Sequence, residues 1–158
     1  MRGAYLSIMT TSHHTLIVVA HRAGARFFEA HGPQADWALI ADIDHPDGAA
    51  KTSELVSDRQ GQVMESFRDG QHAAQPRVDP TEQIAERFAK EIADQLRQKR
   101  VDNWLGRLVL VAPPAFLGRL RGALDEPTAR LVVAELDHNM AQAKPLEIRD
   151  ALSELISV

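Results

Sequence analysis

The side chains with the most evident chemical potential lie between residues 57 and 72. Ser57, Ser66 and His72 share one stretch of chain, as a nucleophile and its general base could. A serine hydrolase carries its nucleophile on a tight turn of the Gly-x-Ser-x-Gly type, and the sequence contains no such pattern. We therefore assign no catalytic residue, and we keep as an alternative a small hydrolase that pairs His72 with a serine of this stretch.

Signatures of cofactor binding are missing from the sequence. It has no P-loop and no Gly-x-Gly-x-x-Gly pattern. Pro113 and Pro114 follow an apolar run at a place where a dinucleotide-binding protein carries glycines, and prolines lack the N–H groups that would donate to a phosphate. We expect no cofactor, and these observations favour a protein that is not an enzyme.

The acidic residues near expected strand ends give little support to a metal site. A calcium loop needs oxygen ligands at its positions 1, 3 and 5 and glycine at position 6. In the stretch DIDHPDG, Pro46 holds position 5 and Asp47 holds the glycine position. A two-metal nuclease needs carboxylates on neighbouring strands, but His21 follows the first expected strand. We expect no metal, and the residues that keep the nuclease alternative open are Asp42, Asp44, Glu135 and Asp137.

Charge is unevenly distributed along the chain. The net charge is −4, which argues against a general nucleic-acid coat and against DNA as a partner. Residues 97–130, called the basic region below, hold seven bases against three acids. The bases are Arg97, Lys99, Arg100, Arg107, Arg119, Arg121 and Arg130, and the acids are Asp102, Asp125 and Glu126. Arg119 and Arg121 are the bases that we expect to contact an anion. The plainer interpretation of the basic region is that its charges are scattered and solvated and form no common surface.

Length and composition are those of an ordinary globular domain. The 158 residues suit one domain that buries a sizeable core without a disulfide or a metal, and the absence of cysteine excludes thiolate chemistry. The apolar runs LIVVA and LVLVA are too short to span a bilayer, and the first residues lack a signal-peptide pattern. We expect a cytoplasmic protein with a loose leader over residues 1–14 and one domain over residues 15–158.

The first third of the chain predicts antiparallel strands. Residues 16–20 are apolar and rich in β-branched side chains, and residues 25–30 pair back on them after a turn that contains glycine. A third strand is expected over residues 36–43, followed by a turn over residues 45–48. Residues 49–78, called the long segment below, show no hydrophobic period. Segments of this length inside a compact domain are usually functional or disordered.

The remainder of the chain alternates helix and strand. Asp79 is a favourable N-cap, Pro80 suits the first helical position, and apolar residues recur every four positions up to Leu96, which predicts a helix over residues 80–100. Next come a strand over 107–112, a helix that opens at Pro113 and Pro114, a break over 125–128, a strand over 129–136 and a helix that opens at Pro145. This alternation implies parallel strands in the second half.

Two side-chain expectations accompany these helices. Glu86 lies four residues before Lys90, so the two should pair on the wet face of the first helix. The last helix should turn its apolar residues inward; they are Ile148, Leu152, Leu155 and Ile156.

Three stretches together resemble the bacterial family known as host attachment protein, or protein required for attachment to host cells. They are SDRQGQ (57–62), HAAQPRVDPTEQIAERFAKEIADQL (72–96), and LVLVAPPAFLGRLRGAL (108–124) with VVAELDHNM (132–140) after it. The resemblance covers residues 16–156. The chain departs from the family pattern after its first strand, where His21 replaces a common aspartate, and in residues 59–62 and 136–140.

The family is similar in layout to the middle domain of the class-1 peptide-chain release factors of archaea and eukaryotes, and of Pelota. That similarity implies an α/β fold: a single three-layer domain with a mixed sheet of about five strands, flanking helices and a ribonuclease-H-like motif. In the release factors, Gly-Gly-Gln in the long loop positions water at the peptidyl-tRNA ester. The nearest match here is Asp69-Gly70-Gln71, in which the first glycine and its backbone freedom are missing.

The sequence as a whole predicts a non-enzymatic protein of the host attachment family. We expect it to bind a macromolecular partner through the long segment and the basic region. The candidate binding residues are Asp58, Arg59, Arg68, Gly70, Gln71, His72, Arg119 and Arg121. The alternative is a translation-related factor that binds ribosomes or RNA. The identity of the partner, the oligomeric state and whether the role in attachment is direct are left open.

Overall fold

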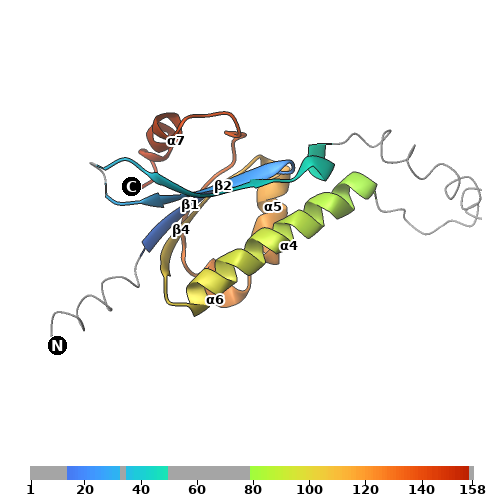
Figure 1. Cartoon of the computed structure of the whole chain (residues 1–158), viewed down its shortest axis with the longest axis horizontal. Coiled ribbons are helices and arrows are strands. Elements are labelled where there is room, and N and C mark those ends of the chain that lie inside the picture. The colour runs from blue at the N-terminus through green and yellow to red at the C-terminus, as the bar shows by residue number, and fades with distance from the viewer. Residues whose placement is uncertain (1–13, 33–34, 50–78, 157–158) are drawn as a thin grey trace, which may run out of the picture.

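The computed structural model describes residues 14–32, 35–49 and 79–156. These residues form a mixed five-stranded sheet in the order β3-β2-β1-β4-β5, drawn in Figure 1. The strands are β1 (His14–His21), β2 (Gly24–Ala30), β3 (Ala38–Asp44), β4 (Leu105–Val111) and β5 (Val132–Leu136). The first three pair antiparallel, whereas β4 lies parallel to β1 and β5 parallel to β4. The predicted α/β class and mixed sheet are confirmed.

Helices cover both faces of the sheet and complete three layers. They are α4 (Pro80–Val101), α5 (Pro114–Ala123), α6 (Glu126–Ala129) and α7 (Pro145–Leu152), with a 3-10 turn, η1 (Pro46–Ala49), after β3. Figure 1 shows α7 on one side of the sheet and α4, α5 and α6 on the other. The three-layer arrangement implied by the resemblance is therefore the one observed.

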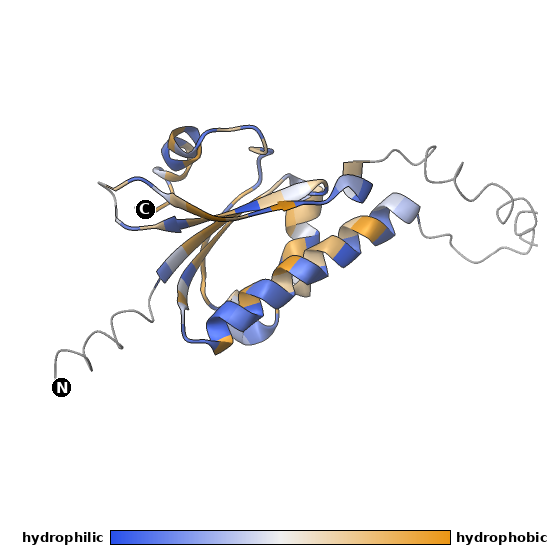
Figure 2. Cartoon of the chain, in the orientation of Figure 1, coloured by the Kyte–Doolittle hydropathy of each residue, from blue (hydrophilic) through white to orange (hydrophobic). Residues whose placement is uncertain are grey.

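The central strand β1 contributes to a hydrophobic core on each face of the sheet. Because successive side chains of a strand point to opposite faces, Leu16 and Val18 join the core under α4, whereas Ile17 and Val19 join the core under α7. All four are at most 1% exposed. Figure 2 shows the central strands coloured mainly as hydrophobic, in contrast to the many hydrophilic residues of α4. A strand covered on both faces has no wet positions, which explains the continuous apolar run in the sequence.

The helix expected over residues 80–100 is confirmed as α4. The Asp79 side chain accepts a hydrogen bond from the backbone N–H of Thr81 at 2.9 Å and so caps the first turn. The four-residue spacing places Phe88, Ile92 and Leu96 on one face, each 0% exposed. Burial of one such side chain contributes about 1.5–3 kcal/mol, so this row fixes α4 on the sheet.

Three local predictions were wrong. The break expected over residues 125–128 contains α6, because the Asp125 carboxylate accepts a hydrogen bond from the Thr128 N–H and caps one helical turn. The following strand starts at Val132 for the same reason. Leu155, expected to face inward, is 52% exposed, because α7 ends before it and the helical period ends there as well.

Candidate functional site

The described residues on either side of the long segment meet at the turn between β1 and β2. After β3, the backbone N–H of His45 donates to the carbonyl of Ala23 at 2.9 Å, and its ring stacks on Phe88 of α4 with 4.2 Å between ring centres. The Arg22 guanidinium donates to the carbonyl of Thr81 in the first turn of α4 at 3.1 Å. The β1–β2 turn thus forms a common base, called the junction below, for η1 and for α4.

Gly48 lies so close to this turn that a larger residue does not fit. A Cβ built on Gly48 would lie 1.6 Å from the carbonyl oxygen of Arg22 and 2.5 Å from its carbonyl carbon. Both opposing atoms belong to the backbone and cannot swing aside as a side-chain end can. This close approach of two backbones requires glycine at position 48.

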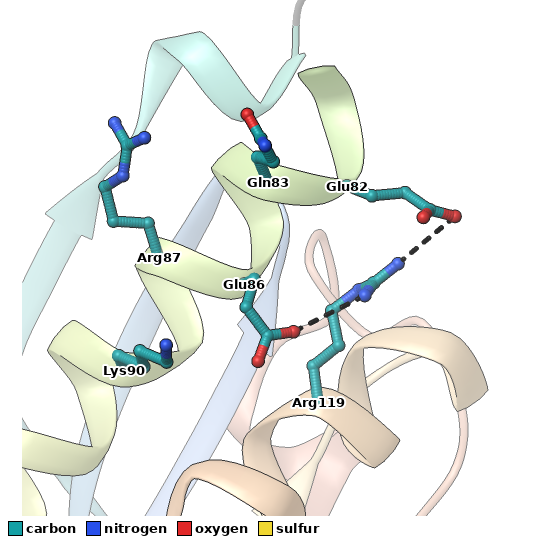
Figure 3. Close-up of a pocket in the computed structure, with 6 residues that line it drawn as sticks. All are labelled: Glu82, Gln83, Glu86, Arg87, Lys90 and Arg119. Carbon is teal, nitrogen blue, oxygen red and sulfur yellow. Dashed lines mark ion pairs between the residues drawn. The ribbon is translucent and has the colours of Figure 1, made fainter. Parts of the chain in front are cut away.

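A groove of about 470 Å³ begins beside the junction, between the first turns of α4 and the middle of α5. Five of its lining residues come from α4 and one from α5; they are Glu82, Gln83, Glu86, Arg87, Lys90 and Arg119. Figure 3 shows the side chains of Glu82, Glu86 and Arg119 turned toward one another. Because positions four apart on a helix share a face, Glu82, Glu86 and Lys90 form one row along α4.

Arg119 lies between two carboxylates in this groove. Its Nη2 is 3.6 Å from Glu82 Oε1 and its Nη1 is 3.6 Å from Glu86 Oε2. Both separations exceed those of a charge-assisted hydrogen bond, which lie near 2.7–2.9 Å. The Arg119 side chain is 26% exposed, and it makes no hydrogen bond within the part of the chain that the structure describes. The two carboxylates attract the Arg119 guanidinium, and its N–H groups remain able to donate hydrogen bonds to a ligand.

The expected pair between Glu86 and Lys90 does not form. Glu86 is drawn instead to Arg119, which reaches it from α5, a contact that depends on how the two helices pack and not on spacing along α4. Lys90 and Arg87 are exposed, and neither forms an ion pair among the described residues. The groove therefore holds three cations and two carboxylates.

Arg121, the second described candidate, points to a different neighbour. Its Nε and Nη2 donate to the two carboxylate oxygens of Glu135 at 3.0 and 2.6 Å, and this hydrogen bonding raises the pKa of Arg121 above its ordinary value. Two further bases of the basic region contact acids: Arg100 donates to Asp125 at 3.1 Å, and Arg130 is paired with Glu126. Asp125 and Glu126 already belong to the three acids counted in the basic region, so of these three contacts only the one with Glu135 lowers its surplus of positive charge further.

The remaining candidates lie outside the described residues. They are Asp58, Arg59, Arg68, Gly70, Gln71 and His72, together with Ser57 and Ser66 of the hydrolase alternative. Residues 1–13 of the expected leader lie outside them too. The binding role of all eight candidates, Arg119 and Arg121 included, stays a prediction.

His21 is the last residue of β1, at the place where a metal-dependent nuclease would need a carboxylate. The backbone N–H of Ala23 donates to His21 Nδ1 at 3.2 Å, so the neutral imidazole carries its proton on Nε2. Burial, helped by the charge of Arg26 and opposed by Asp44, lowers the pKa of His21. Over residues 14–32, 35–49 and 79–156, no three His, Asp or Glu side chains gather closely enough to hold a metal ion.

Sequence reasoning identified Arg119 but missed the groove around it. Glu82, Glu86 and Lys90 were expected only on the wet face of the helix, and Gln83 and Arg87 were not considered. Their spacing of three and four was visible in the sequence, and only the packing of α5 against α4 shows that this face encloses a space. A second contact was missed at the other end of α4, where the His14 ring stacks on Trp104 at 4.4 Å and the Lys99 Nζ lies 5.0 Å from the centre of the Trp104 ring.

Comparison with models of protein families matches residues 16–152 to the family described as "Protein required for attachment to host cells". No curated protein matches the chain at a significant level. No helix within the described residues has the length and apolar character needed to cross a membrane.

Two solved structures resemble the fold at low sequence identity. They are an archaeal protein and the archaeal translation termination factor aRF1, each with 12% identity and a TM-score of 0.47. Each match covers 96% of this chain and 41% of the other. This chain thus spans less than half the length of either protein.

Proposed function

This chain belongs to the family of proteins required for attachment to host cells, and we propose that it acts by binding a macromolecular partner and not by catalysis. The long segment and Arg119 form the binding end of the molecule. Asp58, Arg59, Arg68, Gly70, Gln71 and His72 contribute from the long segment. The role in attachment follows from the complex that this binding forms.

The observation that carries the proposal is the junction. Arg22, His45 and Gly48 join η1 and the first turn of α4 to a single turn of the sheet, so both flanks of the long segment start from one rigid place. These contacts are made by residues that flank the long segment, and they hold both flanks at one place on the sheet. A segment presented from a fixed base is the arrangement of a binding element on a scaffold.

The groove lies at the same end and extends the proposed binding surface onto α4 and α5. Glu82 and Gln83 in its wall belong to the first turns of α4, which directly follow the long segment. The other end of α4 lies about 33 Å away, from 22 residues at 1.5 Å each. Only a large partner could therefore contact the groove and, at the same time, the bases at that far end, which are Arg97, Lys99 and Arg100. A ribosomal particle is the large partner that the translational alternative supplies.

Sedimentation of the tagged full chain from native lysate tests the proposal. We expect the protein to move into the gradient with its partner at low salt. Charge reversal at Arg59 and Arg68 together should return it to the top. Lys144→Glu provides a control, because Lys144 is an exposed base that belongs neither to the long segment nor to the basic region.

The outcomes separate the proposal from its alternative. Co-migration with ribosomal particles that is lost at high salt supports the translational form of the proposal. Co-migration with a complex that contains no ribosomal RNA supports a protein partner. Sedimentation of the protein alone at both salt concentrations contradicts binding, and hydrolytic activity lost on His72→Ala would replace the proposal with the hydrolase alternative.

A further inference from the structure

We propose that the groove between α4 and α5 is a binding site for a phosphate group, with Arg119 as its principal contact. The inference concerns residues that the structure describes and goes beyond the proposed function, because a phosphate-bearing ligand can bind there whether or not the long segment binds a partner.

The first step is the state of the Arg119 guanidinium. It is partly desolvated, with 26% of the side chain exposed, yet its N–H groups make no hydrogen bond to the described residues. Arg121, only two positions along the same helix, donates two hydrogen bonds to one carboxylate. The Arg119 nitrogens are not among the buried atoms that lack a partner, so water reaches them in the free protein and a ligand can replace that water. The fork geometry of the guanidinium matches phosphate oxygens.

The second step is the surplus of positive charge. Arg87 and Lys90 line the same groove as Arg119, and neither has a carboxylate partner among the described residues. Three cations against two carboxylates leave a net charge of about +1 in the groove, if all five groups are ionised. Phosphate has more acceptor oxygens than carboxylate, so it can accept from the Arg119 fork while the surplus positive charge of the groove attracts it.

The third step is the role of the two glutamates. Glu82 and Glu86 hold Arg119 at 3.6 Å each, and their side chains are 59% and 47% exposed. Ion pairs this open to water are worth about 0–1 kcal/mol, so a phosphate can displace them at small cost. The glutamates therefore orient Arg119 in the free protein and compete with the phosphate for it. Removing their charge should tighten the binding of the anion.

The lining of the groove also bears on the rest of the ligand. At about 470 Å³ the space exceeds what one phosphate needs, but every lining side chain is charged or carries an amide. No aromatic or aliphatic residue is among the lining residues to recognise a base or a ring. The groove therefore recognises the phosphate itself, either as a free phosphate compound or as a phosphate of a nucleic-acid backbone.

Titration of the full chain with inorganic phosphate, and separately with a short single-stranded RNA, tests the site by amide NMR shifts or calorimetry. Arg119→Gln should weaken binding by about tenfold or more, the loss expected for a charge-assisted hydrogen-bonded contact. The double variant Glu82→Gln with Glu86→Gln should strengthen it several-fold. Lys144→Gln is the control and should leave binding unchanged, because Lys144 is an exposed cation at the start of α7, on the other face of the sheet from the groove.

Each arm has a defined consequence. Binding of phosphate alone identifies a free phosphate compound as the source, and much tighter binding of RNA identifies a nucleic-acid backbone; both support the site if Arg119→Gln abolishes them. The inference is overturned if neither probe binds, if Arg119→Gln binds as the wild type does, or if the glutamate variant binds more weakly. Urea denaturation of each variant verifies folding. If Arg119→Gln folds poorly, the double glutamate variant still decides the test, because it is expected to bind phosphate more tightly than the wild type.

Discussion

Gly48→Ala adds one methyl group where η1 lies against the β1–β2 turn. The new Cβ would lie 1.6 Å from the carbonyl oxygen of Arg22, far inside the contact distance of two atoms. Because the opposing atoms are backbone, either η1 or the turn must move, and the two are linked by the hydrogen bond from His45 to Ala23. Overpacking of a filled site costs about 1–3 kcal/mol in free energy of unfolding, and we expect a value near the upper end.

The same substitution at Gly118 provides the control. Gly118 lies in α5, and a Cβ built there meets no atom within 4 Å. Alanine is favoured over glycine inside a helix by about 0.8–1.0 kcal/mol, so Gly118→Ala should raise the free energy of unfolding. One chemical change is thus expected to have opposite signs at two positions, with values about 2–4 kcal/mol apart.

Urea denaturation followed by far-UV circular dichroism measures both variants, with the slope of the transition compared to confirm that the midpoints report stability. A midpoint for Gly48→Ala equal to that of the wild type would refute the reasoning, because η1 would then not rest on the turn. A loss of similar size in Gly118→Ala would show that neither effect comes from the described contacts.

Two further predictions concern the core and its dependence on pH. Phe88 is 0% exposed and packs against both His45 and Phe116. Phe88→Ala should therefore lower the free energy of unfolding by about 3–5 kcal/mol. A loss under about 1 kcal/mol in urea denaturation would contradict the packing described. The pKa of His21 lies below its ordinary 6.5 in the folded protein, chiefly through burial, so the unfolded chain takes up the proton first. Stability should therefore fall as the pH drops below about 6.5. His21→Gln should make the urea midpoint depend less on pH between neutral and mildly acidic solution. The same change of midpoint with pH in the wild type and the variant would contradict this.

Local signals in the sequence were sufficient where one element decides its own structure. Asp79, Pro80 and the row from Phe88 to Leu96 specify the start and the buried face of α4 without reference to any other element. The apolar run of β1 likewise identified a strand. The order of strands and helices followed from alternation, and the family resemblance supplied the three-layer arrangement.

Sequence reasoning failed where two elements decide together. Glu86 was expected to pair with Lys90 on its own helix. The packing of α5 against α4 instead brings Arg119 within reach of Glu86, and this contact between helices leaves Lys90 without a carboxylate partner among the described residues. The junction was equally hidden, because Arg22 and Thr81 lie 59 positions apart in sequence. α6 was missed for another reason: one capped turn is too short to show a helical period.

The central claim is that the long segment binds the partner from the base formed by the junction, and its replacement tests that claim most directly. A variant in which a short glycine- and serine-rich linker replaces residues 50–78 should still fold, because η1 and α4 are in contact and a flexible linker can join them. Its urea midpoint should therefore stay near that of the wild type. In a low-salt gradient of native lysate, we predict that this folded variant stays at the top while the wild type moves with its partner. Sedimentation of the variant with the same partner as the wild type would contradict the claim.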